Sequence, residues 1–137
     1  MRREAAGMAE ELPGFIPQVL RRDDVSLLRA DETVFNAMVG GWRAQMLARG
    51  PAVDTIKGRC RLAARFVEFP NEYPWRWRPL DLDQFLADLR SQDSPIALST
   101  LRSCSNAISM FCSYVSDSRY GWVSFCEKQF SNVPSQI

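Results

Sequence analysis

Three basic side chains are spaced so that a single helix would carry them in one row. Lys57, Arg61 and Arg65 stand at positions i, i+4 and i+8, and residues four apart lie above one another on a helix. A row of cations suits the successive phosphates of a nucleic acid. It equally suits the solvated face of an ordinary surface helix, so the spacing alone leaves both interpretations open.

A second candidate surface consists of short polar side chains further along the chain. A helix over about 97–116 would place them on one face with a single charge, namely Arg102, Ser105, Asn106, Ser109 and Ser113. Short hydrogen-bonding groups let a helix approach bases and backbone closely. Ser99 and Thr100 would add hydroxyl donors beside the free N–H groups at the beginning of that helix. Packing by another helix is the alternative use of such a face.

The residue types that usually perform catalysis are scarce. The chain contains no histidine, which removes the commonest general base and the Ser–His, Cys–His and His–metal chemistries. Asp81, Asp83 and Asp88 stand at a predicted helix start, where acids favour the helix dipole. The four cysteines form no CxxC pair and are predicted to be reduced core residues: Cys60, Cys104, Cys112 and Cys126. We therefore predict no catalytic residue, metal site or cofactor in this chain.

The elements that must position these residues are all predicted to be helices. Apolar residues recur at three and four over about 32–49, with Asp31 as the N-cap, and over about 53–69. Further helices are expected as a short segment capped by Asp81, then over about 97–116 and 122–130. The predicted fold class is all-α, a compact bundle of four to five helices.

Length and charge fit one soluble domain. The 137 residues carry a net charge of +1, but residues 33–78 hold eight basic and three acidic side chains, a net charge of +5. The remaining residues are net acidic, so the positive charge is concentrated on one part of the chain. No apolar run approaches the roughly 18 residues that a membrane span needs. No signal peptide is evident either, and we expect a cytoplasmic protein with no membrane partner.

The order of these elements resembles a known DNA-binding domain. Thr55–Phe69 is similar to a helix of that domain in which a threonine and a hydrophobic residue are followed by Leu or Ala and then by Phe. Pro79–Leu89 and Ser99–Val115 look like the next two helices of the same domain. That domain is the core-binding (SAM-like) N-terminal domain of the tyrosine recombinases, the phage-integrase and Xer-type family. The similarity covers about residues 32–130. An aromatic residue usually stands in that family where this chain has Arg59.

The resemblance implies a division of the chain and a function. Residues 1–30 would be an N-terminal arm, 31–130 the DNA-binding domain, and 131–137 the start of a linker to a catalytic domain that this sequence does not contain. The domain would clamp double-stranded DNA, alongside other recombinase protomers, in a cell or element of bacterial, phage or plasmid origin, at the nucleoid when bound. The residues implied at the DNA are Lys57, Arg61, Arg65, Thr100, Arg102, Ser103 and Asn106.

Two other classes of protein fit parts of the same sequence. A helical protein–protein interaction module would use Trp75, Trp77 and Trp122 as exposed anchors. An enzyme that relies on carboxylates would need a concave pocket with two acids facing inward. The exposure of the three tryptophans and the position of the acids in the folded chain distinguish these alternatives.

Overall fold

The computed structural model describes residues 23–137, with side chains from Ala30 onward, so residues 1–22 of the predicted N-terminal arm lie outside it. Within this range the chain forms helices and no strand. The α-helices are α3 (Asp23–Arg49), α4 (Val53–Glu68), α5 (Pro79–Arg90), α6 (Leu98–Ser116) and α7 (Trp122–Phe130), joined by the 3-10 helices η1 (Pro74–Arg76) and η2 (Ser118–Tyr120). The prediction of an all-α bundle is confirmed.

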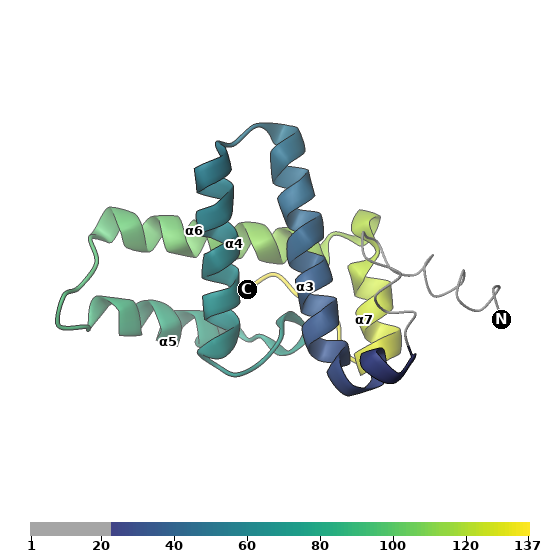
Figure 1. Cartoon of the computed structure of the whole chain (residues 1–137). Helices are drawn as coiled ribbons and strands as arrows, with labels where there is room; N and C mark the ends of the chain where they lie inside the picture. The colour runs from purple at the N-terminus through teal and green to yellow at the C-terminus, as the bar shows by residue number, and fades with distance from the viewer. Residues whose placement is uncertain (1–22) are drawn as a thin grey trace.

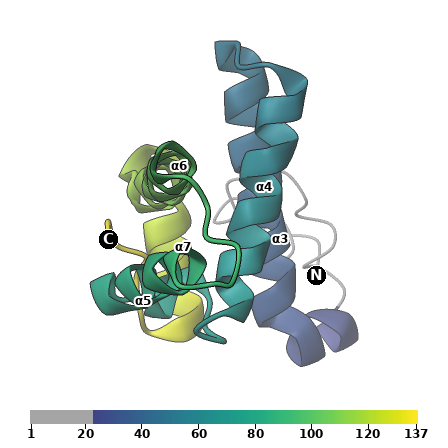
Figure 2. The same cartoon turned by 90° about the vertical axis from the view of Figure 1, so that its left-hand side faces the viewer.

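The helices lie in two layers. α3 and α4 form an antiparallel hairpin that stands upright in Figure 1. The turned view shows α5, α6 and α7 gathered on one side of that hairpin (Figure 2). α6 is the central helix, because it packs against α3, α4, α5 and α7. It contributes Ala107, Ile108, Phe111, Cys112, Tyr114 and Val115 to the buried core.

Local sequence signals set most helix ends close to where they were predicted. The α3–α4 turn uses Gly50 at φ 107°, a backbone conformation that favours glycine, followed by Pro51. α4 ends at Glu68, directly before Phe69-Pro70, because Pro70 has no backbone N–H with which to continue the helix, although Phe69 keeps helical backbone angles. α6 begins one residue later than predicted, and α7 has the predicted bounds.

The predicted start of the first helix is wrong. α3 begins at Asp23, and Asp31 lies inside it rather than at its N-cap. No glycine or proline occurs between Asp23 and Gly40 to break the helix. Residues 23–30 of the predicted arm therefore belong to α3.

Asp81 caps α5 from a different position than predicted. The N-cap residue is Arg78, and Asp81 stands at N3, inside the helix. Its carboxylate accepts hydrogen bonds from the backbone N–H of Arg78 at 2.9 Å and from the guanidinium Nη2 at 2.9 Å. Asp81 thus satisfies a donor at the helix start by reaching back, as the acid of a capping box does.

All four tryptophans are core residues, and the prediction that Trp75, Trp77 and Trp122 are exposed is wrong. Their exposed fractions are 3%, 5% and 0%. Trp75 stacks on Phe130 with ring centroids 4.0 Å apart. The indole N–H groups of the other two find acceptors inside the protein: Trp77 donates to Glu72 O at 2.8 Å and Trp122 to Tyr114 Oη at 3.0 Å. Burial of the large rings is favourable once that polar group is satisfied.

The segment 131–137, predicted as the start of a linker, packs along α6. Pro134 is buried and Ile137 packs against the core. Gln136 Nε2 donates to Ser109 O at 3.1 Å, and Ser113 Oγ donates to Gln136 Oε1 at 2.9 Å. Part of the serine-rich face of α6 is therefore a packing surface for this segment.

Candidate nucleic-acid interface

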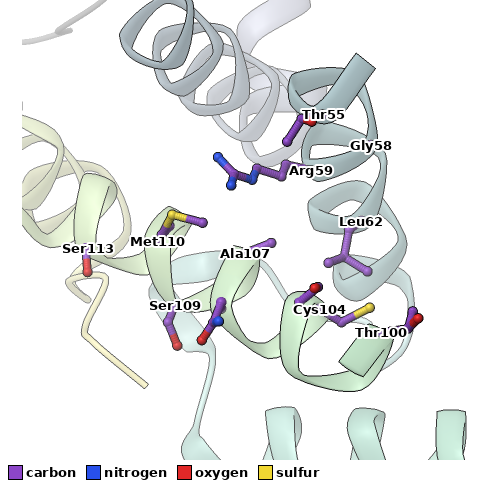
Figure 3. Close-up of a pocket in the computed structure, with 12 residues that line it drawn as sticks. Thr55, Gly58, Arg59, Leu62, Thr100, Cys104, Ala107, Ser109, Met110 and Ser113 are labelled. Carbon is purple, nitrogen blue, oxygen red and sulfur yellow. The ribbon is translucent and has the colours of Figure 1, made fainter. Parts of the chain in front are cut away.

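A groove of about 660 Å³ lies where α4 crosses α6 (Figure 3). Its α4 wall consists of Thr55, Gly58, Arg59 and Leu62. Its α6 wall consists of Thr100, Ser103, Cys104, Asn106, Ala107, Ser109, Met110 and Ser113. The lining contains one cation and no carboxylate. Small residues on both helices leave this space open near the crossing.

Arg59 reaches across the groove towards Met110, as Figure 3 shows. Its side chain is half-buried, and Nη1 lies 3.8 Å from Met46 Sδ, a weak acceptor. Arg59, Met110 and Ser113 also line a second cavity of about 280 Å³, which Arg49 and Arg119 border as well. The two cavities thus meet at Arg59, whose side chain lines both of them.

Arg59 has no acidic partner in the part of the chain described from residue 30 onward. The ion pairs found there are Arg78–Asp81 at 2.9 Å and Arg119–Asp117 at 2.7 Å. The Arg59 guanidinium has five N–H donors, and the one hydrogen bond found for it goes to the Met46 thioether, so donors remain for an anionic or carbonyl ligand. No sequence pattern assigns Arg59 a role, and its half-buried place in the groove identifies it as a candidate site residue.

The basic row on α4 lies beside this groove and not within it. Lys57, Arg61 and Arg65 are all exposed, and none of them lines either cavity. No carboxylate among residues 30–137 lies within 4 Å of any of the three. Arg65 Cζ lies 5.9 Å from the ring centroid of Phe85 on α5, at the outer limit of a cation–π contact. The row therefore runs along α4 as far as the α5 layer.

The predicted α6 residues divide into two groups. Thr100, Ser103 and Asn106 line the groove opposite Arg59. Arg102 is exposed and points to neither cavity. The structure therefore brings three of the four together with the α4 wall and leaves Arg102 on the outer face. Thr55 and Gly58, which the sequence analysis did not select, complete that wall.

The cysteines are free thiols in core or half-buried positions. Burial raises the pKa of Cys112 and of Cys126 to about 12. Burial also raises the pKa of Cys60 and of Cys104, both of which are half-buried. Among the side chains that the structure describes, no group of three or more His, Cys, Asp and Glu could hold a metal ion.

Two acids share one cavity with two arginines. Glu72 and Asp81 line a cavity of about 620 Å³ that Arg76 and Arg78 also border. Burial of Asp81 favours its neutral form, but the hydrogen bonds from Arg78 outweigh this and hold the pKa of Asp81 below its ordinary value. The Asp81 carboxylate stays ionised, and its oxygens are engaged in capping α5.

Comparisons with other proteins add no assignment. The chain matches no protein-family model, no curated protein and no solved structure. Within residues 23–137, no helix combines the length and the apolar character needed to cross a bilayer. The resemblance to the tyrosine recombinases therefore stays a prediction.

Proposed function

We propose that this chain binds double-stranded DNA as the core-binding domain of a site-specific tyrosine recombinase or integrase, and that it is non-catalytic on its own. The observation that carries this proposal is the exposed row of Lys57, Arg61 and Arg65 on α4, with no carboxylate within 4 Å among residues 30–137. Cations held in a row by one rigid helix, and not neutralised internally, offer their charge to a polyanion.

The distribution of charge over the helices supports the same orientation. α4 and α6 together carry five cations and two carboxylates, a net charge of +3. α5, which packs on α6, carries Asp81, Asp83 and Asp88 against Arg90, a net charge of −2. Among these three helices, the excess of positive charge favours a polyanion on the α4 side.

In this proposal the groove brings short polar groups to the same DNA. Thr100, Ser103 and Asn106 would face the duplex from α6, while the α4 row neutralises phosphates. A catalytic domain and other recombinase protomers would complete the reaction, because the resemblance assigns the catalytic residues to that domain. The expected setting is the bacterial cytoplasm, at the nucleoid, for a host, phage or plasmid element.

The test is duplex DNA binding by the whole chain as salt rises. We expect weak binding at low salt whose affinity falls steeply with ionic strength. Changing Lys57, Arg61 and Arg65 together to Ala should weaken binding at least about tenfold. The slope of log K against log salt should also become less steep by about 3, roughly one unit per lost phosphate contact.

A matched control keeps the change of net charge and moves it elsewhere. Arg76, Arg90 and Lys128 are exposed and line neither of the two cavities that meet at Arg59. Their triple Ala variant should retain most of the affinity. Equal losses in the two triple variants would contradict a specific α4 surface. A salt-insensitive complex with a protein, and none with DNA, would favour the protein-interaction alternative over this proposal. The tryptophans that this alternative would use as anchors are buried in the core.

A further inference from the structure

Gly58 is a glycine in the middle of α4 that no contact within the described chain requires. A Cβ built on Gly58 meets no atom within 4 Å, so the helix has room for a side chain there. Glycine is the poorest helix former after proline. Gly41 differs, because a Cβ there would overlap the hydroxyl group of Tyr114. Internal packing therefore accounts for Gly41 and leaves Gly58 unexplained.

The open space beside Gly58 is the groove between α4 and α6. Gly58 forms part of the groove wall, next to Arg59 and one turn before Leu62 (Figure 3). Gly58, Arg61 and Arg65 stand at i, i+3 and i+7, so the glycine also borders the basic row. Gly58 thus lies between the exposed basic row and the groove. A ligand bound along the basic row can approach the α4 backbone at Gly58.

We infer that the α4–α6 groove seats the sugar–phosphate backbone of one DNA strand, with Gly58 allowing the strand to lie against α4 and Arg59 binding a phosphate. The inference rests on the proposed function and names the part of the DNA that this groove takes. Charge favours that occupant, because the lining holds Arg59 and no carboxylate. A phosphate would supply the acceptors that the guanidinium lacks inside the protein.

The rest of the lining fits the alternation of phosphate and sugar. Leu62, Ala107 and Met110 make an apolar floor, and Met110 is 38% exposed. The carbon-rich face of a deoxyribose would cover such a floor. Thr55, Thr100 and Ser103 place hydroxyl groups among these apolar residues, where they would donate to phosphate oxygens.

A pair of matched variants tests this inference. Gly58 and Ala64 stand three residues before and after Arg61, so they flank the basic row on opposite sides, each about 60° round the helix from Arg61. Ala64 is exposed and lines neither cavity. Gly58→Leu would fill the groove, whereas Ala64→Leu adds the same side chain on the other flank. We expect Gly58→Leu to weaken duplex binding at least about tenfold and Ala64→Leu to leave it within about twofold, by the same salt titration.

Two further variants separate a loss of DNA binding from a loss of folding and test the role of the Arg59 guanidinium. Gly58→Ala should raise the Tm by a few degrees, since it removes a helix-weakening glycine, and should still weaken DNA binding. Arg59→Gln should weaken binding and make the salt slope less steep by about one unit. A protein that is more stable and yet binds less well cannot be explained by unfolding.

The outcomes separate this inference from the function on which it rests. If the wild-type chain binds DNA and the Lys57/Arg61/Arg65 variant does not, while Gly58→Leu and Gly58→Ala bind like the wild type, the groove inference is overturned and the DNA-binding function stands. Equal losses in Gly58→Leu and Ala64→Leu, with none in Gly58→Ala or Arg59→Gln, would also overturn it, because the row alone would then hold the DNA. Absence of any wild-type complex at low salt overturns both.

Discussion

The hydroxyl group of Tyr114 on α6 lies against the backbone of Gly41 on α3, in the space that any side chain at position 41 would occupy. The same hydroxyl accepts a hydrogen bond from Trp122 Nε1 at 3.0 Å. A mid-helix glycine weakens α3 by roughly 1 kcal/mol relative to alanine. The close approach of α6 explains why glycine stands there despite that cost.

Gly41→Ala is therefore expected to destabilise the protein, by about 1–3 kcal/mol, because the core would be overpacked. Chemical denaturation would measure the loss. Tyr114→Phe removes the overlapping hydroxyl but leaves the Trp122 N–H without its acceptor, so it should also be destabilising. In a double-mutant cycle the two losses should be less than additive, since the phenylalanine makes room for the alanine. Fully additive losses would contradict the contact.

The tryptophans should report a buried environment. Trp42, Trp75, Trp77 and Trp122 are each at most 5% exposed. We expect a blue-shifted fluorescence emission and little quenching by acrylamide in the native state, with both features lost on unfolding. Emission typical of solvated indole would favour the interaction module with exposed tryptophan anchors.

Stability should fall in acid partly through Asp81. Its folded-state pKa lies below the ordinary value of 3.8 because the hydrogen bonds from Arg78 outweigh the effect of burial. A carboxyl group with a depressed folded pKa stabilises the fold fully above its unfolded pKa, and this contribution is lost as pH falls through the folded pKa. Asp81→Asn should cost about 1–3 kcal/mol at neutral pH and flatten the loss of stability below pH about 4.

Asp117 is the control for that experiment. Hydrogen bonds from Arg119 lower its pKa to about 2, but the pair lies at the surface, where solvent screens ion pairs and makes them weak. Asp117→Asn should change neutral-pH stability far less than Asp81→Asn. Equal effects would indicate that burial does not distinguish the two carboxylates.

The segment 131–137 should protect one thiol in particular. Cys112 is buried and its thiol lies at the backbone of Ile137. In the native protein, thiol reagents near pH 8 should label Cys60 and Cys104 well before Cys112 and Cys126, whose pKa values are about 12. Deletion of residues 131–137 should speed labelling of Cys112 more than that of Cys126. Labelling unchanged by the deletion would contradict the packing of this segment on α6.

The two half-buried thiols also test the DNA interface without a change of charge. Cys104 lines the α4–α6 groove and Cys60 does not. Duplex DNA at low salt should slow the labelling of Cys104 and leave that of Cys60 nearly unchanged. Equal protection of both thiols would point to a general effect of DNA and not to occupation of the groove.

Local sequence determined the helices, because a helix depends on residues three and four apart and on residues that break it. The apolar period, Gly50-Pro51 and Pro70 were enough to predict α4 nearly to the residue, and Lys57, Arg61 and Arg65 form the exposed row that their spacing predicts. The same signals failed where they are weakest. Asp31 resembles an N-cap, but the stretch from Asp23 to Asp31 contains no glycine or proline, and α3 begins at Asp23.

Only the tertiary structure decided what the helices enclose. The loop around Trp75 and Trp77 has no periodicity, so its sequence did not tell whether the rings face solvent or the core. The groove depends on α4 crossing α6, and side chains of segments far apart in the chain set that crossing by packing together. For this reason Arg59 and Gly58 became candidate site residues beside Thr100, Ser103 and Asn106 in the structure alone, while Arg102 from the same predicted set stayed outside.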